Sequence, residues 1–247
     1  MIAVAPLAPA RSVAELRVKL FADGADKAAI LSMCRDPRIA GFTTNPTLMR
    51  KAGVADFETF ARDVLAAVRD RSISFEVFAD DAPEMIRQAR RIASWGENVY
   101  VKIPVTNTRR ESTGPLIREL SADGIKLNVT ALTTLEQVER VCDALAPSTP
   151  CYVSVFAGRI ADTGRDPVPL MREAVQIVRG RPGTELIWAS PRELLNVFQA
   201  DEIGCDIITA THDILAKLAL VGKDLDDYSL DTVRMFFEDA RAAGYAL

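Results

Sequence analysis

The amino-acid sequence predicts an α/β fold, a single (β/α)8 barrel of the TIM type with one extra C-terminal helix. Short β-branched runs recur eight times along the 247 residues, each followed by a polar or glycine-containing turn and an amphipathic helical stretch. The predicted strands are Val18–Phe21, Ala40–Thr43, Ser74–Phe78, Val99–Ile103, Lys126–Thr130, Cys151–Val155, Glu185–Ala189 and Asp206–Thr209. This alternation and length favour a closed parallel barrel, and an open doubly wound sheet remains the alternative.

Helical patterns fill the intervals between these strands. Residues 56–71 and 134–145 place apolar side chains at helical spacing, and Ser12-Val13-Ala14-Glu15 matches a capping box. Three prolines stand where first helical residues are expected: Pro83, Pro167 and Pro191. Each helix is therefore expected to begin shortly after the preceding strand.

The C-terminal segment 229–245 is predicted to form a further amphipathic helix, with Val233, Phe236, Phe237 and Ala240 on one face. It follows the eighth strand and a short predicted helix over residues 213–220, so it is surplus to a minimal barrel. Since no linker interrupts the chain, we interpret residues 1–247 as one domain, with residues 1–11 as a loose N-terminal arm.

Composition limits the classes of partner. The chain is 49% hydrophobic and 26% charged, as ordinary globular domains are, and its formal net charge is −4. Such a chain has no global basic field, so we expect neither nucleic acid nor an anionic membrane surface as partner. Any anionic ligand has to be bound by a local cluster of cations.

The cysteines and the first residues point to a cytoplasmic location. Four cysteines are scattered without a CxxC pair, as reduced core thiols of an intracellular protein would be, and a metal site is not expected. Residues 1–10 contain two prolines and no basic region, so they match neither a signal peptide nor a spanning helix.

Lys102 interrupts the apolar strand 99–105, where leaving a charged amine unpaired is costly. The functional interpretation is a neutral amine in a desolvated site, poised to form a Schiff base with a carbonyl substrate. The alternative is a lysine at a strand end whose long side chain reaches water or a carboxylate partner. For a lone lysine the second interpretation would be the commoner one.

Other polar residues fall at the carboxyl ends of the predicted strands, where the functional groups of a barrel gather. They supply carboxylates, amides, hydroxyls and guanidinium groups: Asp23, Thr43, Thr44, Asn45, Glu76, Asn128, Thr130, Ser154, Arg159, Ser190 and Arg192. Each has a simple structural reading as a turn, cap or solvated residue. Their expected convergence with Lys102 favours an active site.

Two segments, Gly41-Phe42-Thr43-Thr44-Asn45-Pro46-Thr47 and Val101-Lys102-Ile103-Pro104, resemble signature segments of the transaldolases. Further similar segments are Lys126-Leu127-Asn128-Val129-Thr130, Ser154-Val155-Phe156-Ala157-Gly158-Arg159-Ile160 and Ala189-Ser190-Pro191-Arg192. The resemblance runs from about the first strand to the C-terminal helix. In length the chain is similar to the compact members, which include fructose-6-phosphate aldolases.

The resemblance implies an enzyme that needs neither cofactor nor metal and acts on sugar phosphates. Lys102 falls on the Schiff-base lysine. Asp23 falls on the aspartate that takes the proton from the C4 hydroxyl and returns it to the acceptor aldehyde. Glu76 and Thr130 fall on the pair that holds a water for proton transfers.

The resemblance also implies binding residues. Those matching the groups that hold the dihydroxyacetone hydroxyls, with the side chain packed beside them, are Asn45, Asn128, Ser154 and Thr43. Those matching the phosphate site are Arg159, Ser190 and Arg192.

Two positions bear on whether a three-carbon unit is transferred or released. The compact aldolases carry a glutamine and a tyrosine where this chain has Glu76 and Phe156, which is the transaldolase combination. A phenol near the enamine could help to protonate it, and a phenylalanine cannot. The structural alternative for Phe156 is a plain core aromatic residue. We therefore predict a transaldolase. The alternatives are an aldolase that releases free dihydroxyacetone, and a catalytically silent sugar-phosphate binding protein.

The chain departs from the family pattern at Gly24, Pro191 and His212. His212 is expected to begin a helix, and a contact to the acceptor sugar is the functional alternative. Arg109 and Arg110 are expected to be solvated, with a further anion contact as the alternative.

In compact relatives the C-terminal helix packs across a neighbouring subunit. The resemblance thus implies a homo-oligomer, a pentamer or decamer, acting in the pentose phosphate pathway or in a specialised sugar pathway.

Overall fold

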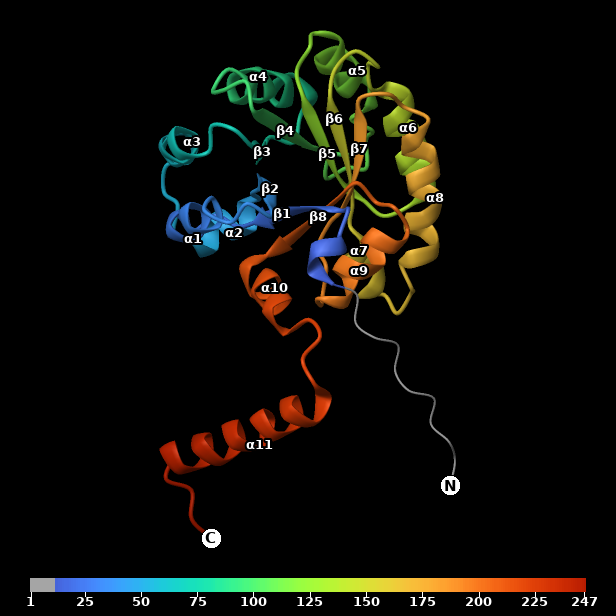
Figure 1. The fold of residues 1–247 in the computed structure, drawn as a ribbon. Coiled ribbons are helices and arrows are strands. Elements are labelled where there is room, and N and C mark those ends of the chain that lie inside the picture. The colour runs from blue at the N-terminus through green and yellow to red at the C-terminus, as the bar shows by residue number, and fades with distance from the viewer. Residues whose placement is uncertain (1–11) are drawn as a thin grey trace. The chain divides into compact units, whose positions relative to one another are not determined.

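The computed structural model describes residues 12–247 and confirms the predicted closed barrel (Figure 1). Parallel strands pair in the order β1 to β8, and β8 closes on β1. The strands are β1 (Lys19–Asp23), β2 (Ile39–Thr43), β3 (Ser72–Glu76), β4 (Val99–Pro104), β5 (Leu127–Leu132), β6 (Cys151–Val155), β7 (Thr184–Trp188) and β8 (Ile207–Thr211). Every predicted strand is present within two residues of its expected ends. The expected arm 1–11 lies outside the described residues.

Helices occupy the intervals between the strands and lie outside the ring that the strands form (Figure 1). They are α1 (Lys27–Met33), α2 (Pro46–Lys51), α3 (Phe57–Ala67), α4 (Ala82–Ala93), α5 (Gly114–Ala122), α6 (Leu135–Ala144), α7 (Ala157–Ala161), α8 (Val168–Arg179) and α9 (Leu195–Glu202), and α10 (His212–Ala216) follows the last strand. Short 3-10 turns are η1 (Val13–Glu15) and η2 (Lys217–Leu220), and the last helix is α11 (Leu225–Ala242).

Most helix starts follow the expected capping chemistry. The Asp56 carboxylate accepts a hydrogen bond from the Thr59 amide and caps α3, while Thr134 and Gln137 form a reciprocal capping box at α6. Pro83 lies in the first turn of α4, and Pro167 occupies the position just before α8 without making a side-chain cap hydrogen bond.

The prediction that Pro191 begins a helix is wrong. Helix α9 begins only at Leu195, because the Asn196 side-chain oxygen accepts hydrogen bonds from the Arg192 and Glu193 amides. These bonds hold residues 190–194 as a loop at the end of β7.

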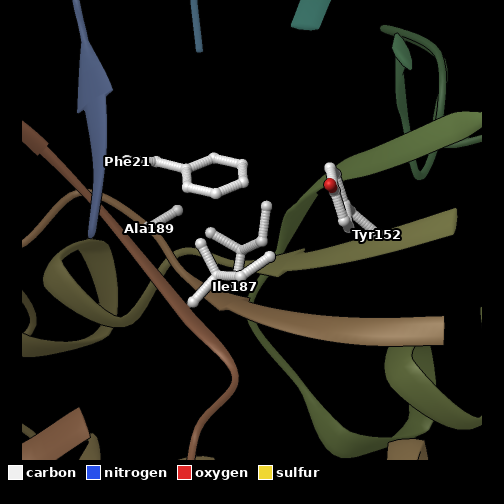
Figure 2. Packing of buried hydrophobic residues seen from close by; sticks show 5 residues of the cluster. Phe21, Tyr152, Ile187 and Ala189 are labelled. Carbon is white, nitrogen blue, oxygen red and sulfur yellow. The ribbon is translucent and has the colours of Figure 1, made fainter. Parts of the chain in front are cut away.

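An apolar cluster fills the barrel interior (Figure 2). Phe21 on β1 and Tyr152 on β6 meet edge to face, with ring centroids 5.8 Å apart. Because β1 and β6 are not neighbours in the ring, this contact crosses the interior. Ile187 and Ala189 join the cluster, and Tyr100 stacks on Tyr152 with centroids 4.0 Å apart. This cluster packs the barrel interior below the polar side chains at the carboxyl ends of the strands.

The chain divides into two compact units. The barrel unit is Leu16–Ala216, and the second unit includes Lys217–Leu247. The interpretation of the whole chain as one domain stays a prediction.

Helix α11 begins four residues earlier than predicted, because the Asp224 carboxylate accepts hydrogen bonds from the amides of Asp226 and Asp227. Its large apolar side chains are exposed, with Val233, Phe236 and Phe237 each at 60–63%. The helix therefore carries an apolar face made of these side chains.

Candidate active site

A pocket of about 660 Å³ opens where the carboxyl ends of the strands meet the following loops. It is lined by all the residues predicted for the site: Asp23, Thr43, Asn45, Glu76, Lys102, Asn128, Thr130, Ser154, Phe156, Arg159, Ser190 and Arg192. Parallel strands closed into a ring bring these residues together although they are distant in sequence. Thr44, also considered from the sequence, is buried beside the pocket and does not line it.

Lys102 stands on β4 with only 6% of its surface exposed. Its Nζ donates a hydrogen bond to the Thr44 carbonyl at 2.8 Å and lies 3.1 Å from Oε2 of Glu76. Thr44 is itself fixed, since its amide and hydroxyl both donate to the Ser74 carbonyl. The amine is thus held inside the pocket beside a carboxylate, rather than extended into water.

Asp23, at the end of β1, shares a hydrogen-bonded chain with two hydroxyls. Thr43 donates to Oδ1 of Asp23 at 2.7 Å, and the Thr43 and Thr209 hydroxyls lie 2.6 Å apart. Burial raises the pKa of the Asp23 carboxyl above its usual value; Lys102 and the Thr43 hydrogen bond partly offset this rise, and the Glu76 charge adds to it. A carboxyl with a raised pKa is suited to give and take protons.

A second hydrogen-bonded chain orients the Asn128 amide on β5. Its nitrogen donates to the Ser74 hydroxyl at 3.0 Å, and its oxygen accepts from the Ser154 hydroxyl at 2.7 Å. Both partners are buried. The amide is therefore fixed in one orientation on the pocket wall.

Ser74 and Thr209 support these chains, and the sequence analysis did not single them out. Their signal is the alternation of side chains along a strand. Ser74 precedes Glu76 by two residues and Thr209 precedes Thr211 by two, so each faces the barrel interior.

Thr130 contributes a hydroxyl that no side chain or backbone group engages within the part of the chain that the structure describes. A buried polar atom without a partner costs about 1–3 kcal/mol, so such atoms tend to mark places where a ligand or water is bound. Trp95 and Trp188 carry the other such atoms, and neither lines this pocket.

Asn45 and Phe156 complete the wall. The Asn45 oxygen caps α2 by accepting from the Leu48 amide at 2.9 Å, which leaves the amide nitrogen for a ligand. The Phe156 ring is half-buried and offers the pocket no proton donor.

Cationic and hydroxyl groups gather on the side of the pocket formed by the ends of β6 and β7. Arg159 is on α7, and Ser190 and Arg192 are on the loop after β7. The guanidinium of Arg192 makes a bidentate ion pair with Asp162, with Nε 2.8 Å from Oδ1. This pair lowers the pKa of the exposed Asp162 carboxyl. The group can hold a phosphate, for which planar guanidinium donors are well suited.

Three ambiguous residues from the sequence analysis lie outside the pocket. His212 is the exposed first residue of α10, which confirms the helix-start interpretation. Arg109 pairs with Asp80 and Glu111 on the surface, and Arg110 is exposed with a φ of 64°. Lys51 and Asp213 line the pocket although the sequence analysis did not propose them for the site.

The described residues, 12–247, offer neither a cluster of side chains suited to a metal ion nor a membrane-spanning helix. No group of three or more His, Cys, Asp or Glu side chains in this range is arranged to hold a metal ion. None of its helices has the length and apolar character that crossing a bilayer requires.

Comparisons with known proteins find a matching family, related sequences and similar solved structures. Residues 20–247 match the family model described as transaldolase/fructose-6-phosphate aldolase. A probable transaldolase of Dehalococcoides mccartyi is 34% identical over 202 residues, covering 81% of this chain and 90% of the relative. A probable transaldolase of Thermoanaerobacter sp. is 35% identical over 228 residues, covering 92% and 99%.

Solved structures support the fold. The chain superposes on the crystal structure of KGPDC from Streptococcus mutans with a TM-score of 0.56 at 10% identity, covering 81% of this chain and 90% of that one. At this identity the likeness concerns the barrel alone.

Proposed function

Because this chain belongs to the transaldolase/fructose-6-phosphate aldolase family, we propose that it is a transaldolase, transferring a dihydroxyacetone unit from a ketose phosphate to an aldose phosphate. The donor is of the fructose 6-phosphate or sedoheptulose 7-phosphate type. One observation carries the proposal: the amine of Lys102 is buried in the pocket, 3.1 Å from the Glu76 carboxylate. A binding protein has no need of such a pair, whereas Schiff-base chemistry does.

The reaction begins with attack of the Lys102 amine on the C2 carbonyl of the ketose. Attack requires the neutral amine, and Glu76 is close enough to take a proton from the ammonium form. The resulting carbinolamine loses water to give an iminium ion. Thr130, whose hydroxyl is unengaged, lines the same pocket and can hold that water with Glu76.

Asp23 then accepts the proton of the C4 hydroxyl while the C3–C4 bond breaks. The aldose phosphate leaves as an aldehyde, and the electron pair remains on the enamine attached to Lys102. A second aldose phosphate accepts this pair at its carbonyl carbon, Asp23 returns the proton to the new hydroxyl, and hydrolysis releases the product ketose. The raised pKa of Asp23 suits both directions of this proton transfer.

Residues on two sides of the pocket bind two different parts of the substrate. The side chains assigned to the dihydroxyacetone hydroxyls are Asn45, Asn128 and Ser154, with Thr43 beside them. The side chains assigned to the phosphate are Arg159, Ser190 and Arg192.

The Phe156 side chain favours transfer of the dihydroxyacetone unit over its release. An enamine that is not protonated waits for the second aldehyde, and the Phe156 ring supplies no proton. The alternative is an aldolase that releases free dihydroxyacetone. We test this with fructose 6-phosphate alone and with an added aldose phosphate acceptor. A transaldolase forms product ketose only with the acceptor and releases little dihydroxyacetone; an aldolase releases it at the same rate in both.

The assembly and location are part of the proposal. The exposed apolar side chains of α11 support a homo-oligomer, a pentamer or decamer, in which this helix meets another subunit. The free cysteines, three of them buried, support a cytoplasmic enzyme of sugar-phosphate metabolism, in the pentose phosphate pathway or a related route. A native mass equal to one chain at micromolar concentration would contradict the oligomer.

A further inference from the structure

We infer that Gly158 and Asp162, at the two ends of the short helix α7, are positioning residues for the anion-binding side of the pocket. The inference rests on the proposed function, in which Arg159, Ser190 and Arg192 hold the substrate phosphate. It assigns the placement of that site to two residues that do not line the pocket themselves.

Because Gly158 has no side chain, the loop after β7 can lie directly against the backbone of α7. A Cβ at this position would stand 1.5 Å from the Ser190 carbonyl oxygen and 3.3 Å from Cζ of Arg192. The Gly158 amide also points at the Ala189 carbonyl, 3.4 Å away. Any side chain here would therefore have to push the loop away, by about 1.5 Å or more before ordinary contact is reached.

Ser190 shows that this approach constrains the loop. Its φ is 57°, a left-handed conformation that a residue other than glycine adopts at a cost. Strain of this kind persists only where the surroundings impose it, and it is concentrated at binding and catalytic sites. The surroundings here are the Gly158 backbone on one side and the Asn196 side chain, bonded to the Arg192 amide, on the other.

Asp162 fixes the side chain of Arg192, the second phosphate-binding residue on the loop after β7. It follows α7 directly, and its two carboxylate oxygens bind Nε and a terminal nitrogen of Arg192. The bidentate pair holds the plane of the guanidinium group. Between Gly158 and Asp162, α7 carries Arg159, so this one helical turn sets the positions of all three residues proposed to bind the phosphate.

The test compares Gly158→Ala with Gly180→Ala, a glycine at the end of α8 whose added Cβ would meet only its own helix at 3.3 Å. Three quantities distinguish an effect on the anion-binding side from an effect on Lys102. KM for fructose 6-phosphate and the inhibition constant of inorganic phosphate report anion binding, and borohydride trapping with dihydroxyacetone, which carries no phosphate, reports the lysine. We expect Gly158→Ala to raise KM and the inhibition constant of inorganic phosphate by about 10- to 100-fold, since a displacement near 1 Å can cost that much. Trapping should stay within twofold of wild type, and Gly180→Ala should resemble wild type throughout.

Asp162→Ala gives an independent test if Gly158→Ala fails to fold. Removing a negative charge beside the phosphate would by itself tighten phosphate binding, whereas loss of positioning weakens it. We expect KM for fructose 6-phosphate to rise severalfold, with Asp162→Asn intermediate and trapping by dihydroxyacetone unchanged. An unchanged or lowered KM in Asp162→Ala, or an unchanged KM in folded Gly158→Ala, would overturn the inference. An equal loss of trapping and phosphate binding would also overturn it, and a wild-type enzyme that fails to trap dihydroxyacetone would refute the proposed function instead.

Discussion

Glu76 and Lys102 are directly paired residues of neighbouring strands, β3 and β4, and their charged atoms lie 3.1 Å apart inside the barrel. The pairing fixes the distance between a carboxylate and an amine through backbone hydrogen bonds rather than through a flexible loop. Sites built on strands are held more firmly than sites on loops. This rigidity is what a multistep reaction at one amine requires.

The pH dependence of activity should report Asp23. Proton removal from the C4 hydroxyl needs the ionised carboxylate, so kcat/KM should fall on the acidic side with a midpoint above the usual aspartate pKa of about 3.9. The Thr43 hydrogen bond lowers the pKa of Asp23, so Thr43→Val should move this acidic limb to higher pH. Steady-state rates across pH 4–9 would measure the acidic limb in the wild-type enzyme and in Thr43→Val. An acidic limb that stays in place in Thr43→Val would contradict this assignment.

The same carboxyl should make the fold less stable at neutral pH. Its pKa is raised in the folded state, so folding favours the protonated form, and the stability this form gives is lost as pH rises through the folded pKa. Asp23→Asn removes the ionised form and should therefore raise Tm at pH 7–8. The advantage should disappear as pH falls towards the usual aspartate pKa, where Asp23 is neutral in both states. Thermal unfolding at several pH values tests this, and a Tm lowered at pH 8 would count against it.

Ser74→Ala should loosen the Asn128 amide. The variant leaves an N–H of Asn128 without its buried acceptor, which should cost about 1–3 kcal/mol in the free energy of unfolding and raise KM for the ketose. Urea denaturation and steady-state kinetics measure the two effects. Ser94→Ala is the matched control, because the Ser94 hydroxyl is exposed and does not line the pocket. Equal stabilities and equal KM values for the two variants would rule out the role given to Ser74.

Phe156→Tyr should change the fate of the enamine. The added phenol hydroxyl offers a proton donor in the pocket, so free dihydroxyacetone should form from fructose 6-phosphate without acceptor at a rate severalfold above wild type. Transfer to an aldose phosphate should fall in proportion. Release that remains at the wild-type level would show that the residue at this position does not decide between transfer and cleavage.

The barrel and its polar mouth could be predicted because strand alternation and an out-of-place charge are local signals. Lys102 stood out because it interrupts an apolar strand. The polar residues expected at the strand ends proved to form much of the pocket wall. The parts that could not be predicted depend on packing between distant segments. The contact of Gly158 with Ser190 and the pair of Asp162 with Arg192 are invisible until α7 and the loop after β7 are placed side by side.

Local signals were also misleading at one helix start. Pro191 matches the preference for a first helical position, yet the Asn196 side chain competes for the next two amides and delays the helix to Leu195. Ser74 and Thr209 were missed for a different reason. A serine or threonine within an apolar strand is common, and only the partners Asn128 and Thr43 reveal its purpose.

The most direct test is borohydride reduction in the presence of fructose 6-phosphate, followed by peptide mapping. The account predicts one reduced adduct carrying the three-carbon unit, on the peptide that contains Lys102, and none in Lys102→Met, whose turnover should fall by about 10⁴-fold or more. An adduct on another lysine, or a Lys102→Met enzyme that turns over at the wild-type rate, would contradict the central claim.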